Sequence, residues 1–156
     1  MPDRLQAELK QTKPFPRPSA EAALNILRTA AVLEHRLGEA LKPHRITTTQ
    51  YNVLRILRGA GPKGLCGREI GERMVSRVPD VSRLLDRLEE MGLIRRERDE
   101  TDRRHVTARI SPKGLDLVAR ATVPLEAVER AMFGHIDAKR LEAVIDALED
   151  VRGAGG

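Results

Sequence analysis

Residues 81–110 read VSRLLDRLEEMGLIRRERDETDRRHVTARI, and this stretch decides which fold we predict for the chain. Its first part places apolar side chains three, four and seven positions apart, at Val81, Leu84, Leu85 and Leu88. That spacing is typical of an amphipathic helix that packs through one face. Arg83 lies about 150° from this face at roughly 100° per residue, so its side chain should point to solvent. Pro79 is predicted to lie in the first turn of this helix, where a missing N–H costs nothing, and Gly92 ends the helix.

A hairpin is predicted directly after this helix. Residues 105–110 alternate between polar and apolar side chains, which indicates a half-buried strand, and residues 93–99 supply the strand before it. Between them lies a polar tip, residues 100–104, that ends in two arginines. A short helix at residues 67–74, a turn, a second helix and a hairpin form the order of a winged helix-turn-helix. That motif presents a helix to the major groove of DNA and a cationic loop to the minor groove.

The segments before this motif are predicted to be helical beyond a proline-containing arm. Ser19 can cap a helix that runs to about Leu41 and is apolar over more than half of its circumference. Such a helix needs partners on two sides, and one of them could be a second subunit. Thr47 and Gln50 form a capping box that opens the next helix, which ends near Gly59.

Two further helices are predicted after the hairpin. Ser111 as cap and Pro112 as first residue open a helix toward Phe133, with Pro124 as a kink or break. The last helix covers residues 137–151. We therefore expect a mainly α-helical fold with a small β-wing. Its expected parts are an irregular arm (1–18), a dimerisation helix (19–46), the winged helix-turn-helix DNA-binding region (47–111), C-terminal dimerisation helices (112–152) and a flexible tail (153–156).

Composition and charge favour a polyanionic partner. The net charge is +5, Trp is absent, and aromatic residues make up 2% of the chain, so Leu, Ile, Val and Ala must build the core. No long apolar run predicts a membrane span, the start does not resemble a secretory signal, and the single cysteine allows no internal disulfide. We expect a cytoplasmic protein.

The charge of the predicted DNA-reading region is nearly balanced. Residues 66–109 carry 11 Lys and Arg against 10 Asp and Glu. DNA binding must therefore depend on where the arginines point. Asp86 and Glu90 lie on the exposed side of the predicted reading helix, toward its end. Since acids should stay clear of phosphates, we infer that only the first half of this helix enters the groove.

Three short stretches together resemble the MarR family of bacterial transcriptional regulators. They are residues 84–96 (LLDRLEEMGLIRR), residues 102–104 (DRR) and residues 110–114 (ISPKG), and the helix order agrees over about residues 19–151. The resemblance implies a homodimer, held by the first and last two helices, that binds a palindromic double-stranded DNA operator, usually as a repressor. It also implies release of DNA by a small phenolic or lipophilic effector.

The resemblance also assigns roles to residues of this chain. Insertion into the major groove maps onto Pro79 and Arg83, and insertion into the minor groove maps onto Arg103 and Arg104. Asp102 beside these arginines can pair with one and orient the other. Asp80 can accept a hydrogen bond from cytosine or cap the helix, and we favour the cap.

Weaker assignments concern the surroundings of the motif. Where the family usually has a small capping residue, this chain has Arg77. Candidate phosphate contacts near helix starts are Ser76, Arg77, Arg68 and Thr48. Candidate effector contacts are His44, Arg45 and Tyr51, although Tyr51 is equally a core residue.

The sequence contains no recognisable catalytic, cofactor or metal motif. It has no nucleophile elbow, phosphate loop or dinucleotide fingerprint, and its four histidines are scattered, so we expect no enzyme, no cofactor and no metal site. Cys66 precedes a short helix and is best explained as structural filler. The alternatives are a helical protein-interaction module that uses the winged helix as a scaffold, and a redox- or metal-responsive variant of the same regulator.

Overall fold

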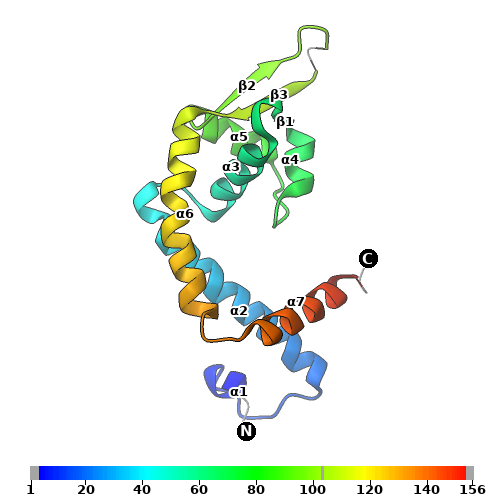
Figure 1. Ribbon diagram of the computed structural model, residues 1–156. Helices are drawn as coiled ribbons and strands as arrows, with labels where there is room; N and C mark the ends of the chain where they lie inside the picture. The colour runs from blue at the N-terminus through cyan, green and yellow to red at the C-terminus, as the bar shows by residue number, and fades with distance from the viewer. Residues whose placement is uncertain (1–3, 103, 154–156) are drawn as a thin grey trace. The chain divides into compact units, whose positions relative to one another are not determined.

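A computed structural model describes residues 4–102 and 104–153 of the chain (Figure 1). The chain divides into two compact units, residues 1–48 and residues 49–156. Each unit is described by itself below. Within the described ranges, none of the helices combines the length and the apolar character that a membrane crossing requires.

The first unit contains three helical segments. They are α1 (Arg4–Glu8), α2 (Pro18–Leu41) and the short 3₁₀ helix η1 (Lys42–His44). The expected irregular arm therefore includes one short helix, whose Leu5 is only 3% exposed. The Glu8 carboxylate lies 3.6 Å from Nε of Arg28 on α2. The arm is thus held by one buried apolar side chain and one exposed ion pair.

The start of α2 differs from the prediction. Ser19 is not its cap, because the helix begins at Pro18 and the cap residue Arg17 makes no side-chain capping bond. Proline suits the first helical position because its missing N–H would have no partner there in any case. Residues 22–31 of α2 are all exposed. They include the apolar side chains Leu24, Ile26 and Leu27.

The second unit contains the predicted motif and the C-terminal helices. Its elements are α3 (Thr48–Ala60, which starts at the boundary), η2 (Gly61–Lys63), β1 (Leu65–Cys66), α4 (Gly67–Arg73), α5 (Val81–Glu90), β2 (Ile94–Arg98), β3 (Val106–Ile110), α6 (Pro112–Phe133) and α7 (Ala138–Gly153). Mainly helical structure with a small antiparallel sheet is what the sequence predicts.

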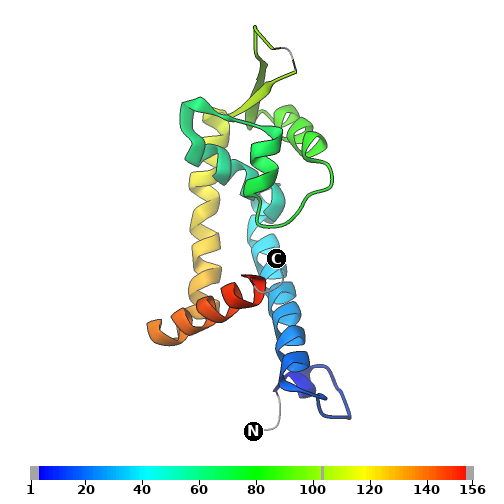
Figure 2. The same ribbon diagram turned by 90° about the vertical axis from the view of Figure 1, so that its right-hand side faces the viewer.

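The sheet has three strands in the order β1-β3-β2. In the hairpin, Ile94 faces Ile110 and Arg98 faces Val106, and the tip projects beyond α3, α4 and α5 (Figures 1 and 2). The strand β1 was not predicted. It contributes only Leu65 and Cys66 to the edge of β3, and two residues are too few to show an alternating pattern.

Leucine and other aliphatic side chains build the core of this unit. The buried apolar residues are Val53, Leu54 and Leu57 of α3, Ile70 of α4, Leu85 and Leu88 of α5, Leu65, Leu93, Ile94 and Ala108 in and around the sheet, and Leu117, Val118, Ala121 and Leu125 of α6. Burying each large aliphatic side chain contributes roughly 1.5–3 kcal/mol. The apolar face predicted for α5 is therefore the face that packs.

The ends of α5 also follow from local chemistry. Gly92 adopts φ 76°, and the backbone N–H groups of Gly92 and Leu93 donate to the carbonyls of Glu89 and Leu88 at 2.9 and 3.0 Å. A residue with positive φ directly after a helix is commonly glycine, since other side chains are strained there. The prediction that the helix ends at Gly92 is confirmed.

Two proline predictions need correction. Pro79 precedes the cap residue of α5 and does not lie in its first turn. Pro124 lies inside α6, which continues through it from Pro112 to Phe133 without a break. A proline removes one hydrogen bond from a helix interior, and the remaining bonds and the packed face carry this helix past it. The last helix, α7, has no buried residue.

Candidate nucleic-acid interface

The first turn of α5 is fixed by its cap. A carboxylate oxygen of Asp80 accepts a hydrogen bond from the backbone N–H of Arg83 at 3.0 Å. Of the two roles considered for Asp80, the structure shows the cap. Capping satisfies one of the N–H groups that a helix start leaves without a partner. Arg83 itself is exposed, as its position opposite the apolar face predicts.

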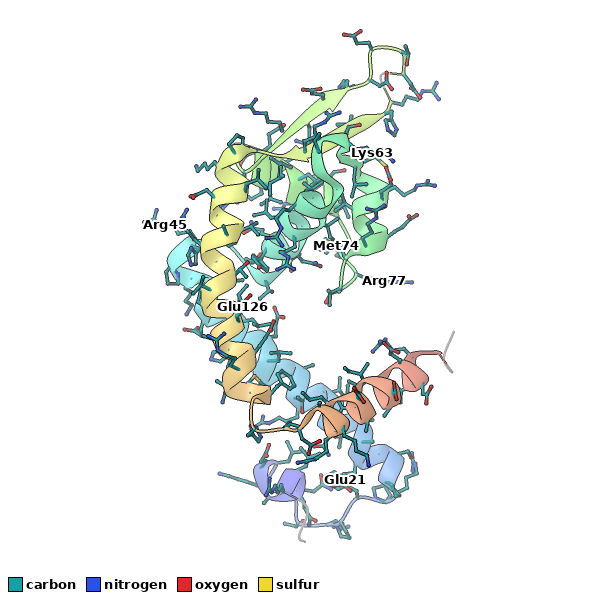
Figure 3. The ribbon with its side chains drawn as sticks, in the orientation of Figure 1. Glu21, Arg45, Lys63, Met74, Arg77 and Glu126 are labelled. Carbon is teal, nitrogen blue, oxygen red and sulfur yellow. The ribbon has the colours of Figure 1, made fainter. Side chains whose placement is uncertain are left out.

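The loop before α5 is attached to α3. The side-chain oxygen of Asn52 accepts from the backbone N–H of Val75 at 2.9 Å, just after α4 ends. Ser76 and Arg77 follow on this loop and are exposed. Figure 3 shows Arg77 on the outside of the loop. One amide side chain of α3 therefore anchors the segment that leads into α5.

The tip of the β2–β3 hairpin is shaped by two aspartates. The Asp99 carboxylate accepts from the backbone N–H and the hydroxyl of Thr101 at 2.9 and 2.8 Å, and these bonds lower the pKa of Asp99. The Asp102 carboxylate accepts from the backbone N–H of Arg104 at 3.1 Å. We expected Asp102 to pair with an arginine side chain, and among the described residues its bond goes to the backbone instead. Arg103 lies outside the described residues.

Several acids of the second unit form ion pairs with nearby arginines, which partly neutralise their negative charge. Glu97 pairs with Arg109 at 3.3 Å, while Glu90 pairs with Arg87 and Glu72 pairs with Arg68, each at 3.9 Å. Arg68, a candidate phosphate contact, therefore already has an acidic neighbour. In the part of the chain that the structure describes, no ion pair holds the guanidinium groups of Arg77, Arg83 and Arg104. These three groups remain available for phosphates or base edges.

A cluster around Arg96 was not predicted from the sequence. Asp86 and Glu89 of α5 both bind this arginine of β2, whose pKa rises because hydrogen bonds to the two carboxylates outweigh its partial burial. The available signal was the i, i+3 spacing of two acids on the helix, followed by an arginine in the next strand.

A surface hollow of about 700 Å³ follows the exposed side of α5. Its lining residues are Gln50, Asp80, Arg83, Leu84, Asp86, Arg87 and Glu90. The hollow holds both positive and negative groups, and the first turn supplies Arg83. Its charge distribution agrees with the inference that the start of α5, and not its end, faces a polyanion.

The weaker candidates have the following surroundings. The hydroxyl of Thr48 donates to the carboxylate of Glu34 on α2, so it is already occupied. His44 is half-buried, and Arg45 is exposed with φ 58° at the end of η1. These residues belong to the first unit.

Tyr51 belongs to the second unit and links α3 to α6. Its hydroxyl lies 2.8 Å from the hydroxyl of Thr122, and Nη1 of Arg55 donates to it at 3.2 Å. The guanidinium carbon of Arg55 also lies over the Tyr51 ring, 5.9 Å from the ring centroid. Tyr51 thus has a packing and hydrogen-bonding role in this unit.

Cys66 is a helix cap. Its side chain accepts from the backbone N–H of Glu69, and the Glu69 carboxylate accepts from the backbone N–H of Cys66 at 3.2 Å. Hydrogen bonding by the side chain and then the backbone of Cys66 lowers the pKa of Glu69. This agrees with the structural role favoured for Cys66, which here is to cap α4. Residues 4–102 and 104–153 contain no group of three His, Cys, Asp or Glu side chains arranged to hold a metal ion.

Comparison with known proteins identifies the family. The MarR family model matches residues 46–106. The uncharacterized HTH-type transcriptional regulator YkoM of Bacillus subtilis (strain 168) is 33% identical over 105 residues, which are 64% of this chain and 66% of that protein. The chain spans 66% and 60% of the lengths of two curated relatives that it matches.

Solved structures match over more of the chain. The crystal structure of a MarR transcription factor from Planctomyces limnophilus is 31% identical, with a TM-score of 0.69 and coverage of 87% of this chain and 98% of that one. A structure of Bordetella bronchiseptica BpsR, described with the regulation of its DNA binding by 6-hydroxynicotinic acid, is 20% identical, with a TM-score of 0.77 and coverage of 90% and 98%. With its winged helix-turn-helix and these matches, the chain belongs to the MarR family of DNA-binding transcriptional regulators, which are not enzymes.

Proposed function

We propose that the chain is a homodimeric repressor that binds a palindromic operator and leaves it when a small aromatic or lipophilic effector binds. The observation that carries the proposal is the position of three exposed arginines, none of which forms an ion pair with another described residue. Arg77 precedes α5, Arg83 lies in its first turn and Arg104 lies on the hairpin tip. A helix and a hairpin with such cationic positions suit the two grooves of DNA.

The first turn of α5 would enter the major groove. Arg83 can donate two hydrogen bonds to a guanine, a contact that discriminates against a wrong base by ~1–3 kcal/mol. Asp80 keeps its capping role and Pro79 lies next to it on the same exposed turn. Ser76 and Arg77 on the preceding loop would contact phosphates, which position the protein without reading sequence. We do not assign phosphate contacts to Thr48 and Arg68, because each already has an acidic side chain as a partner.

The hairpin would enter the minor groove beside it. Arg104 and Arg103 carry positive charge. Minor grooves that are narrow and A·T-rich attract such charge, because their negative potential is enhanced. Asp102 would hold the tip in shape by accepting from the backbone N–H of Arg104. This gives each subunit two contacts of different kinds on one half-site.

Dimerisation would use the helices outside this lobe. In α2 the exposed apolar residues are Leu24, Ile26 and Leu27, and in α7 they are Val144, Ile145 and Val151. We assign residues 19–46 and 112–152 to the dimer contact and residues 47–111 to DNA. A second copy is the occupant that a palindromic operator requires, with half-sites about 10–10.5 bp apart. A cytoplasmic location belongs to the same proposal because the DNA target lies there.

The effector is the least specified part of the proposal. It is supported by the family membership and by BpsR, whose DNA binding is regulated by 6-hydroxynicotinic acid. By linkage, an effector that weakens DNA binding must itself bind more weakly to the DNA complex. Substituting Tyr51, His44 and Arg45 one at a time would show which side chain an effector contacts. Equal effector affinity for free and DNA-bound protein would contradict release by this route.

Selection of genomic fragments by the purified protein, followed by footprinting, tests the core of the proposal. We expect a symmetric protected site, a dimer by light scattering, and an affinity that falls steeply with salt. Arg83→Ala should reduce the preference for the selected site over random DNA more than it reduces binding to random DNA. The matched control is Arg4→Ala on α1, which removes the same charge from an exposed arginine outside the residues assigned to DNA and to the dimer contact. A monomer, or a chain without DNA affinity, would favour the alternative of a protein-interaction module.

A further inference from the structure

Arg96 of β2 connects the reading helix to the hairpin. The Glu89 carboxylate accepts from the backbone N–H of Arg96 at 2.9 Å through one oxygen, and from Nε and Nη2 at 3.3 and 3.1 Å through the other. The Asp86 carboxylate accepts from Nη2 at 2.5 Å. Two acids one turn apart on α5 thus bind the side chain and the backbone of one strand residue.

The cluster is less exposed than the other ion pairs of this lobe. The side chains of Arg96, Glu89 and Asp86 are 22%, 40% and 58% exposed, whereas those of Arg87 and Glu90, which pair on the same helix, are both 71% exposed. A partly buried pair with several directed hydrogen bonds restrains geometry better than an exposed pair, which contributes little. The planar guanidinium presents its donors in a fixed fork, so its orientation is restrained together with its position.

This connection has two consequences for a DNA-binding lobe. It neutralises acids of α5 that would otherwise face a polyanion. It also restrains the angle and distance between α5 and the strand that leads to the hairpin tip. Both contacts of one half-site depend on that relation, because α5 and the tip must fit adjacent grooves at the same time.

We propose that Arg96 is a positioning residue for DNA recognition, which couples α5 to the β2–β3 hairpin through Asp86 and Glu89. It contacts the two carboxylates and not the DNA. The inference rests on the proposed function, in which Arg83 reads the major groove and Arg104 enters the minor groove. Operator preference, and not general affinity for DNA, is the property that this coupling should control.

The first test compares two substitutions that remove the same charge from α5. Asp86→Asn replaces the ion pair with Arg96 by at most a neutral hydrogen bond, whereas the matched control Glu90→Gln removes the charge of an exposed acid that does not contact β2. Electrostatics alone predicts that both variants bind every DNA more tightly. We expect this of Glu90→Gln, while Asp86→Asn should lower the ratio of operator to random-DNA affinity by about threefold or more. If the two variants behave alike, the proposal is wrong.

The second test is a double-mutant cycle between Arg96 and the hairpin tip. The loss of operator affinity caused by Arg104→Ala is measured in the wild type and in the Arg96→Ala background. If Arg96 positions the hairpin, the loss should be smaller in the second background by about threefold or more. Equal losses would overturn the coupling. A salt dependence reduced by about one unit in Arg96→Ala would instead indicate a phosphate contact.

A conservative variant keeps the second test decisive if Arg96→Ala does not fold. Arg96→Lys preserves the charge but lacks the fork, so it should bind random DNA like the wild type and lose operator preference. Full operator preference in a folded Arg96→Lys variant would overturn the proposal. The proposed function fails separately, if the wild type shows no operator preference or if Arg104→Ala has no effect in the wild type.

Discussion

The hydroxyl of Ser111 donates a hydrogen bond to the backbone carbonyl of Gly92 at 2.6 Å. The same oxygen accepts from the backbone N–H of Gly114 at 3.0 Å, so it also caps α6. Nζ of Lys113 donates to the carbonyl of Met91 at 2.8 Å. The first turn of α6 therefore satisfies carbonyl groups at the end of α5, which a helix end leaves without partners. These hydrogen bonds join the end of α5 to the start of α6.

Ser111→Ala should destabilise the protein by about 1–2 kcal/mol, because it removes a helix cap and the hydrogen bond to the carbonyl of Gly92. The midpoint of urea unfolding at a fixed protein concentration measures this change. Ser19→Ala is the control, because Ser19 is exposed and caps nothing. A midpoint that moves no further for Ser111→Ala than for Ser19→Ala would show that the hydroxyl is dispensable.

Gly114→Ala should destabilise the protein by about 1–3 kcal/mol. A Cβ at this position would collide with the backbone carbonyl of Leu93 and lie 2.8 Å from Cγ1 of Ile110. Backbone atoms cannot move away cheaply, so the start of α6 would have to shift away from Leu93. The matched variant is Gly59→Ala in α3, where a Cβ would meet nothing within 4 Å. It should stabilise the protein by about 0.5–1 kcal/mol, and equal effects of the two substitutions would contradict the crowding argument.

The helices could be predicted from the sequence because their signals are local. The period of Val81, Leu84, Leu85 and Leu88 defined the packed face of α5, and the Ser111-Pro112 pair defined the start of α6. The strand β1 could not be predicted in this way. Its two residues gain their structure from pairing with Ala108 and Thr107, about forty positions later in the chain. Such pairing depends on tertiary structure and not on a local pattern.

Local signals in the sequence also predicted part of the candidate site. Charge and helical period were sufficient to show that Arg83 points outward and that Asp80 caps the helix. They could not show which acids are neutralised, because the Arg96 cluster joins a helix to a strand across the turn at Gly92. They also did not predict that the Asp102 carboxylate accepts a hydrogen bond from the backbone N–H of Arg104. Short acids in turns commonly bind nearby backbone groups.

The Glu69 carboxylate should make stability depend on pH in the acid range. Its pKa is lowered in the folded protein by hydrogen bonds from Cys66, from an ordinary value of 4.5. A lowered folded-state pKa means that the contribution to stability is present above pH 4.5 and is lost as the pH falls through the folded-state pKa. The thermal midpoint of Glu69→Gln should therefore lie below that of the wild type near pH 7. The difference between the two midpoints should shrink as the pH falls below 4.5 and through the lowered pKa of Glu69, and a difference that stays constant with pH would exclude this carboxylate as the cause.

Asp102 should act on DNA binding through the shape of the hairpin tip. Asp102→Asn keeps an oxygen that can accept from the backbone N–H of Arg104, and it removes a negative charge beside the DNA. It should preserve operator preference and bind all DNA somewhat more tightly. Asp102→Ala removes the same charge together with the acceptor, so the tip loses a restraint and must be ordered when DNA binds. We expect Asp102→Ala to bind the operator more weakly than Asp102→Asn, with faster amide exchange at Arg104. If both variants bind the operator equally, charge and not turn geometry is the contribution of Asp102.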